Sequence, residues 1–225
     1  YQFMVVNGFN GYDDEGKFSG KSGLRGGRQK GAESYITFPD LAGRISYYGQ
    51  PGFNLGLSAY VGDSESKAYD GLDLADEMAV ASADSTIIGI QMLGVDARYQ
   101  KGALQLRGQY IIANLSNTDQ YNAKSSTDLG SKMTGYYAEL GYNILANYNT
   151  TNELICFARY ENYNTHAEAE KATVINDAYN RTDITIGLGF KMAQGAMFKA
   201  DYQLLSDESS ENKKGQFNFG TAIWF

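Results

Sequence analysis

Polar and charged side chains recur at every second position within several apolar stretches of the chain. From residue 104 to 112, for example, the apolar residues Leu104, Leu106, Tyr110 and Ile112 alternate with Gln105, Arg107 and Gln109. A period of two places successive side chains on opposite faces of a β-strand. Ionisable groups gathered on one face of a sheet can line an aqueous channel, or they can join strands through ion pairs.

Equivalent polar positions in other stretches carry charges of both signs. The basic candidates are Arg44, Arg98, Arg107, Arg159, Lys191 and Lys199, and the acidic candidates are Asp96, Glu139, Glu153, Glu161, Asp183 and Asp201. Such a set of ionisable groups would be costly in a dry core unless each found a partner. We therefore predict that this face either lines a wet bore or holds a plugged one together through ion pairs.

Two long polar stretches add further charge. The first, residues 8–40, is rich in glycine, and it carries Lys17 and a candidate constriction set that could fold into a bore: Lys21, Arg25, Arg28 and Lys30. The sequence favours the simpler interpretation of a solvated external loop. The second, residues 63–85, is acidic, and carboxylates at short intervals can hold Ca²⁺. Because no EF-hand spacing is present, we interpret it as a solvated charge run and predict no metal site.

No residue pattern typical of an enzyme stands out. The stretch from Gly11 to Lys17 approaches a phosphate-binding loop, but Phe18 follows where Ser or Thr is required. His166 is the single histidine and falls in a predicted loop, where a solvated side chain is expected. The single cysteine, Cys156, excludes an intrachain disulfide and a thiolate metal cluster. We therefore predict no catalytic residue, no cofactor and no enzymatic activity.

Ten stretches are expected to form strands of about 9–11 residues, the length that crosses a bilayer at a tilt. They begin near Tyr1, Leu41, Phe53, Thr86, Ala103, Lys132, Glu153, Arg181, Ala196 and Gly215. Short turns (49–52, 100–102, 146–152 and 193–195) alternate with long polar loops (8–40, 63–85, 115–131, 163–180 and 206–214). This alternation is typical of an up-and-down antiparallel barrel in an outer membrane.

The last stretch ends on an aromatic residue in register with other apolar residues. Phe217, Phe219, Ile223 and Phe225 share one face. This pattern resembles the C-terminal signal of bacterial outer-membrane barrels, which implies contact with the barrel assembly machinery. Aromatic residues also gather on the apolar face near both ends of the other strands, as interfacial girdles do. A soluble β-sandwich, in which apolar faces meet each other, is the alternative.

The composition fits a β-protein without membrane-spanning helices. The 225 residues include 18 Tyr, 11 Phe and only two Pro, and the net charge is −7. No run of about 18 apolar residues exists, so a transmembrane helix is not expected. The negative net charge argues against nucleic acid as a partner.

Several stretches resemble the C-terminal part of the phosphate-selective porin O/P family of Gram-negative outer membranes. They are YQFMVVNGFN (1–10), LGVDARYQKGALQLRGQY (93–110), FARYENY (157–163), residues 185–203 and residues 217–225. The resemblance implies that residues 1–225 form one all-β domain, an antiparallel up-and-down transmembrane β-barrel. Its ten strands would belong to a larger porin barrel of about 16–18 strands. The resemblance also implies a homotrimer and a basic anion pathway, whereas the charges of the expected strands here are balanced.

Two hypotheses of function follow. The first is an outer-membrane porin that allows passive diffusion of small hydrophilic solutes or ions, with anions such as phosphate implied by the resemblance. The second is a sealed barrel that acts as an adhesin, receptor or interaction scaffold through its long extracellular loops. Both place the protein in the bacterial outer membrane, in contact with its lipid.

Overall fold

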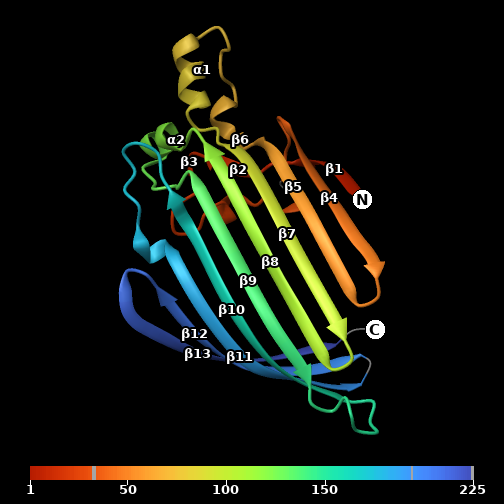
Figure 1. The fold of residues 1–225 in the computed structure, drawn as a ribbon. Coiled ribbons are helices and arrows are strands. Elements are labelled where there is room, and N and C mark those ends of the chain that lie inside the picture. Colours follow the sequence, from red (N-terminus) through yellow and green to blue (C-terminus); the bar gives the residue numbers. More distant parts are fainter. Residues whose placement is uncertain (32–33, 194, 224–225) are drawn as a thin grey trace.

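One antiparallel sheet of ten strands dominates the computed structural model, which describes residues 1–31, 34–193 and 195–223 (Figure 1). Across the sheet the strands are β1 (Gln2–Asn7), β4 (Pro39–Gln50), β5 (Phe53–Asp63), β7 (Gly89–Lys101), β8 (Leu104–Ser116), β9 (Lys132–Asn143), β10 (Glu153–Glu168), β11 (Asn180–Ala193), β12 (Ala196–Asp207) and β13 (Ser210–Ile223). Neighbours in the sheet follow one another along the chain, so the sheet is an up-and-down arrangement. The predicted antiparallel strands are therefore confirmed.

The two edges of this sheet are not joined to each other. Among the described residues, β1 pairs only with β4, and β13 pairs only with β12. Figure 1 shows that the sheet is curved, with β12 and β13 turning away from the plane of β5, β7 and β8. The structure thus contains a curved open sheet that does not close within the described residues, and the larger barrel that the sequence suggests stays a prediction.

Two connections differ from the sequence-based prediction. The prediction placed long loops at residues 163–180 and 206–214, but β10 continues to Glu168 and β13 already begins at Ser210. At the second place, the amide of Ser209 donates a 3.0 Å hydrogen bond to the carboxylate of Asp207, which closes a tight turn. Backbone pairing between strands does not require apolar side chains, so polar residues extend the hairpin beyond the apolar band.

The short turns depend on glycine at two places. Gly52 and Gly102 adopt φ values of +77° and +57°, a left-handed conformation that glycine takes without a steric penalty. Gly52 also accepts a 2.7 Å hydrogen bond from the amide of Gln100 in the neighbouring turn. These turns fix the register of the hairpins β4–β5 and β7–β8.

The long connections contain short elements of their own. Within the described residues they hold β2 (Asn10–Asp13), β3 (Glu15–Gly16), β6 (Glu65–Ser66), α1 (Glu77–Asp84), α2 (Thr118–Ser125) and the 3₁₀ turns η1 (Arg25–Gly27), η3 (Lys67–Tyr69) and η4 (Asp177–Tyr179). β3, β2 and β6 form a small second sheet. The side chain of Asp76 caps α1 by accepting 3.1 Å hydrogen bonds from the amides of Met78 and Ala79. No described helix has the length and apolar character required to cross a bilayer.

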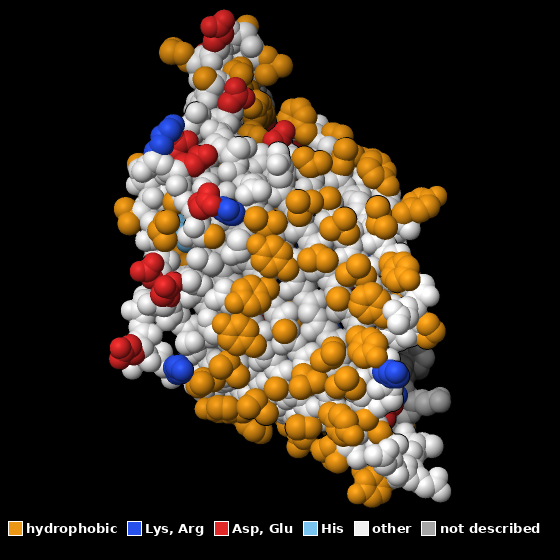
Figure 2. Space-filling model, viewed as in Figure 1, with side chains coloured by type: hydrophobic (Ala, Val, Ile, Leu, Met, Phe, Trp, Pro, Cys, Tyr) orange, Lys and Arg blue, Asp and Glu red, His pale blue; other side chains and the backbone are white. Residues whose placement is uncertain are grey.

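One face of the main sheet is apolar and uncovered. Leu57, Leu93, Leu140, Ile186 and Leu188 are among its exposed side chains, and Figure 2 shows apolar groups spread over the strands. The small core lies elsewhere, where the first long connection meets the opposite face. It consists of Phe18, Leu24, Ile88, Ile90, Leu115, Tyr121 and Leu129. The main sheet therefore has no layer over its apolar face within the described residues.

Candidate functional site on the charged face

The charged candidates from the sequence all project from the face opposite the apolar one. Strand register shows this, because residues directly opposite each other on paired strands share a face. Arg98 lies opposite Arg107, Arg107 opposite Glu139, and Glu139 opposite Arg159. The same register and alternation place Arg44, Asp96, Glu161, Asp183, Lys191, Lys199 and Asp201 on this face. We call it the charged face.

Arg44 and Asp96 form a double contact that spans an intervening strand. The guanidinium nitrogens Nη1 and Nη2 lie 2.7 Å and 3.0 Å from the two carboxylate oxygens. Gly56 on β5 lies between them, and a Cβ there would come within 2.1 Å of Arg44 Nη2 and 2.6 Å of the Asp96 carboxylate. Glycine at this position therefore leaves the room that the ion pair occupies.

Other charges pair with close neighbours on the sheet. Arg107 Nε lies 2.8 Å from Glu139, and Lys191 Nζ lies 2.8 Å from Glu153, in both cases directly across from one strand to the next. Two further pairs join residues on the same strand: Arg159 with Glu161 at 2.5 Å, and Lys199 with Asp201 at 3.6 Å. Most cations of the charged face are therefore ion-paired with a carboxylate.

Aromatic rings hold two of these cations from a second side. The Arg159 guanidinium lies 4.1 Å from the ring centre of Tyr137, and the Lys199 ammonium lies 4.5 Å from that of Phe157. A cation over an aromatic face is attracted by the negative charge of the ring surface. These contacts fix the cations in place without neutralising their charge.

The central row across β7, β8, β9 and β10 is locally positive. It contains three guanidinium groups, from Arg98, Arg107 and Arg159, against the single carboxylate of Glu139. Within the described residues, Arg98 has no ion-pair partner. The charged face thus has a basic stripe of three arginines, of which Arg107 and Arg159 are ion-paired with Glu139 and Glu161, even though its charges are balanced as a whole.

The first long connection, residues 8–38, which we call the first loop, folds over the upper part of the charged face. The backbone amide of Phe18 donates a 3.1 Å hydrogen bond to the Tyr121 hydroxyl, which in turn donates to the carbonyl of Gly11 at 2.6 Å. The sequence favoured a solvated external loop. The structure corrects this in part, because the loop packs on the sheet although Lys21, Arg25, Arg28 and Lys30 are exposed. Phe18 and Leu24 are buried, so the loop gains apolar contact by lying against the sheet.

Asp128 anchors the middle of the first loop. Its carboxylate accepts hydrogen bonds from the amide of Gly20 at 2.9 Å and from the hydroxyl of Tyr179 at 2.8 Å. The hydrogen bond to Asp128 raises the pKa of Tyr179, because ionising the phenol would place two negative charges side by side. The Arg181 guanidinium adds contacts of 3.2 Å to the carbonyl of Lys21. These contacts tie the loop to the connections after β8 and β10.

His166 is a buried residue of β10, which corrects the predicted solvated loop histidine. Its Nδ1 accepts a 3.1 Å hydrogen bond from the amide of Asn176, and its Nε2 contacts the backbone carbonyl of Asp128. A nitrogen that accepts from a peptide N–H is unprotonated, so Nε2 carries the proton. The ring therefore ties two connections together.

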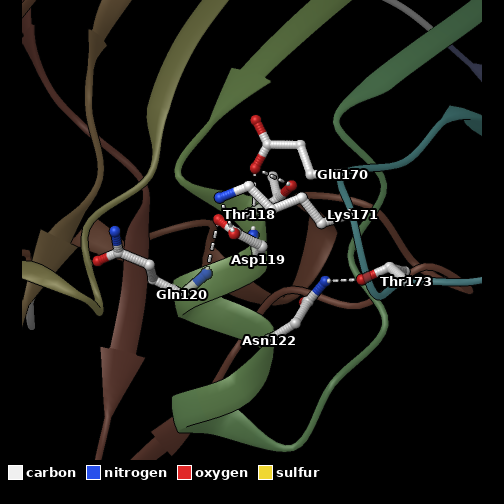
Figure 3. A network of polar contacts seen from close by, with 7 residues as sticks. All are labelled: Thr118, Asp119, Gln120, Asn122, Glu170, Lys171 and Thr173. Atoms are coloured by element: carbon white, nitrogen blue, oxygen red, sulfur yellow. Dashed lines mark hydrogen bonds and ion pairs between the residues drawn. The ribbon is translucent and has the colours of Figure 1, made fainter.

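A second polar network joins α2 to the connection after β10 (Figure 3). Glu170 accepts hydrogen bonds from the Thr118 hydroxyl at 3.0 Å and the Asp119 amide at 3.2 Å. Lys171 lies 2.8 Å from Asp119, and its ammonium lowers the pKa of that carboxyl. Asn122 donates to Thr173 at 3.0 Å. The connections on this side of the sheet therefore interlock, whereas the sequence suggested separate polar loops.

The predicted constriction residues lie on the part of the first loop that crosses the charged face. Arg25 and Arg28 begin and follow the 3₁₀ turn η1, and residues three apart in such a turn project from the same side. With Lys17 and Lys30 they line a hollow of about 700 Å³, and none of the described residues in its lining is acidic. Lys21 is exposed beside it. The structure thus gathers three of the four predicted cations, Arg25, Arg28 and Lys30, around one basic hollow.

The acidic second connection does not gather its carboxylates into a ligand cage. Within residues 1–31, 34–193 and 195–223, no group of three His, Cys, Asp or Glu side chains converges as metal ligands would. Tyr69 instead donates a hydrogen bond to Asp84, and Glu65 is buried with its carboxylate accepting from the amide of Thr37 at 2.9 Å.

The predicted C-terminal signal falls on β13. Phe217, Phe219 and Ile223 are exposed on the apolar face of this edge strand. Phe225 lies outside the described residues. The apolar row is therefore available for contact over the part of the strand that the structure describes.

Sequence reasoning missed Tyr121, Asp128 and the anchoring role of His166. Each of them acts through a backbone group of a distant segment, and such partners leave no spacing pattern. A usable signal did exist inside the first loop, where Phe9, Phe18 and Leu24 are too apolar for a fully solvated segment.

Comparison with known proteins adds one relative. No protein-family model matches the chain. The chain is similar to an uncharacterized protein of Aquifex aeolicus (strain VF5), with 27% identity over 203 residues. The match covers 90% of this chain and 44% of the relative, so the chain spans less than half the length of the protein that it matches.

Proposed function

We propose that this chain is part of an outer-membrane porin, a β-barrel that lets small hydrophilic solutes or ions diffuse passively across the membrane. The observation that carries the proposal is the division of one curved, up-and-down sheet into an uncovered apolar face and a charged face. In water, an exposed apolar face of this extent would promote aggregation. Against lipid tails it is stable, because its backbone groups are paired within the sheet.

The open edges support a larger barrel rather than closure by these strands alone. β1 and β13 each present unpaired backbone groups, which a membrane barrel must satisfy by pairing. The similar Aquifex protein is more than twice as long as the matched region. We infer that further strands of a longer chain complete the wall, to about 16–18 strands in total.

Selectivity would arise where the first loop narrows the bore. The basic stripe of Arg98, Arg107 and Arg159 lies on the wall, and Arg25 and Arg28 lie on the loop. Rings of charge at a constriction select ions of the opposite sign. We therefore expect a preference for anions, with phosphate as one candidate.

The partners of such a protein would be outer-membrane lipid along the apolar face and the barrel assembly machinery at β13. A homotrimer is the assembly that we propose for the complete barrel. Cross-linking of the full-length protein in native membranes would test it, with a three-subunit product as the expected result.

Planar bilayer recording of the full-length protein tests the porin proposal. We expect discrete conductance steps and a reversal potential of anionic sign across a KCl gradient. Replacing Arg25 and Arg28 together by Gln should shift the reversal potential toward zero, whereas replacing Lys101, an exposed residue at the end of β7, should not. Inserted protein that gives no steps would contradict a porin.

A sealed barrel that works through its loops is the second candidate. The interlocked connections around α2 and the first loop favour it, because they cover part of the charged face. Leu74 and Met78 are also exposed on the projecting segment around α1, where a protein partner could bind (Figure 1). Bilayer recording separates the two candidates, since a sealed barrel conducts nothing.

A further inference from the structure

Below the first loop, the charged face changes character and becomes apolar. A hollow of about 640 Å³ lies there, and its floor includes Met92, Ile111 and Met133, which point to the same side of the sheet as the arginine stripe. Ile111 is 39% exposed, and it lies on the same face of the sheet as the arginine stripe. The core beneath the loop does not reach far enough to cover it.

Two cations of the first loop border this hollow. Arg25 and Arg28 line it, and the same two residues also line the basic hollow on the other side of the loop. Among the described residues, neither guanidinium has a carboxylate within 4.0 Å or a side-chain hydrogen bond. The apolar hollow therefore has positive charge along one border, and its lining contains no acidic residue from the part of the chain that the structure describes.

The loop backbone holds the two arginines in this position. A Cβ at Gly26 would come within 2.1 Å of the carbonyl oxygen of Lys17, and a Cβ at Gly27 within 2.4 Å of that of Asn10. The turn between the arginines is thus packed against the rest of the loop. Gly23 rests on the wall in the same way, since a Cβ there would come within 3.0 Å of the Met133 sulfur.

We propose that this hollow binds small organic anions that have an apolar body, in particular alkyl or aryl monocarboxylates. The carboxylate would accept hydrogen bonds from Arg25 and Arg28, as guanidinium groups donate to carboxylates in a planar fork. The hydrocarbon would lie on Ile111, Met92 and Met133. A volume of this size is within the range of small-molecule sites.

This inference rests on the proposed function only in that the bore gives the anion access to the hollow. It predicts a preference that charge alone would not produce. Fully burying one methylene increases affinity about fourfold. Hexanoate has four methylenes more than acetate, and because the hollow is open we expect it to bind about tenfold more tightly than acetate.

Isothermal titration of the full-length protein in detergent tests the site with hexanoate and acetate as probes. We expect Arg25→Gln with Arg28→Gln to weaken binding of both anions at least about tenfold, through loss of two charge-assisted hydrogen bonds. Ile111→Thr should bring the hexanoate-to-acetate ratio close to one while keeping a strand-forming residue. Ile155→Thr is the matched control. Ile155 lies on the same face of the sheet as Ile111 but near the start of β10 and outside the lining of the hollow, so this variant should keep the ratio of the native protein.

The folding of each variant is checked by its resistance to unfolding in SDS at room temperature. Arg25→Lys is a further control: it keeps the positive charge and should still bind hexanoate. Equal affinity for hexanoate and acetate in the native protein would overturn the proposal. An equal loss of preference in Ile111→Thr and Ile155→Thr would overturn it as well. Bilayer recording separates this proposal from the porin proposal. Conductance without a preference for hexanoate would contradict the anion site alone, and hexanoate binding without conductance would contradict the porin alone.

Discussion

Gly27 in the first loop is packed so closely that a larger side chain does not fit there. A Cβ there would come within 2.4 Å of both the carbonyl oxygen of Asn10 and the Phe18 ring. Gly31, four residues later in the same loop, has no heavy atom within 4 Å of such a Cβ. The two glycines therefore form a matched pair that separates packing from backbone entropy.

We predict that Gly27→Ala loosens the first loop, because overpacking of a fitted site typically costs about 1–3 kcal/mol. Limited trypsin digestion should then cut faster after Arg25 and Arg28, while Gly31→Ala keeps the rate of the native protein. Equal cleavage rates in the two variants would show that Gly27 is not packed against the Phe18 ring.

Tyr69 provides a residue-scale test of the second connection. Burial, and then its hydrogen bond to Asp84, raise its pKa to about 12 from an ordinary value near 10. Because the folded state holds this proton more tightly, the contribution to stability is present below about pH 10 and is lost as the pH rises through 12.

We predict that phenolate absorbance shows ionisation near pH 12 from two tyrosines, Tyr35 and Tyr69, and that Tyr69→Phe removes about half of it. Asp84→Asn should lower the pH of that step, since the carboxylate no longer opposes phenol ionisation. If Tyr69→Phe instead removes absorbance near the ordinary tyrosine value and leaves the ionisation near pH 12 unchanged, the phenol is not held by Asp84.

At the scale of elements, the first loop depends on α2. The Tyr121 hydroxyl is fully buried, accepts from the amide of Phe18 and donates to the carbonyl of Gly11. Removing it leaves the Phe18 amide without a partner, whereas the Gly11 carbonyl still accepts from the amide of Lys17. A buried unpaired group costs about 1–3 kcal/mol.

We therefore predict that Tyr121→Phe speeds hydrogen exchange at the Phe18 amide by about tenfold or more. Tyr148→Phe, at an exposed tyrosine in a short turn, is the control and should leave the Phe18 amide unchanged. Unchanged protection at Phe18 in both variants would contradict the anchoring role of α2.

The sequence predicted the strands well because alternation is a local property. Stretches such as 104–112 carry apolar and polar faces in their own residues, so neither partner strands nor loops need to be known. The polar extension of β13 from Ser210 was missed, because the strand is paired there through its backbone and its side chains show no apolar alternation.

The arrangement of the connections was harder to predict because it depends on contacts between distant residues. The first loop appeared external from its charges and glycines, while its fold is decided by Phe18 and Leu24 against the sheet. His166 appeared solvated from its polar neighbours, while its ring binds the carbonyl of Asp128, 38 positions away. For the candidate site, the sequence predicted that the charged strand residues share one face, but it did not predict the contacts of the connections.

At the scale of the whole molecule, the sheet is a wall with two different surfaces. The apolar surface is uncovered, and the charged surface carries the ion pairs and the first loop. Our account assigns the first surface to lipid and the second to water. The pattern along a single strand should therefore alternate between the two environments.

The most direct test places a fluorescent thiol probe at successive positions of β8, in a Cys156→Ser background, with the full-length protein in lipid vesicles. Probes at Leu106 and Tyr110 should be quenched by brominated acyl chains, and probes at Gln105 and Gln109 by aqueous iodide, which gives a period of two. Iodide quenching at all four positions, or brominated-lipid quenching at none of them, would contradict the membrane barrel and the porin function that rests on it.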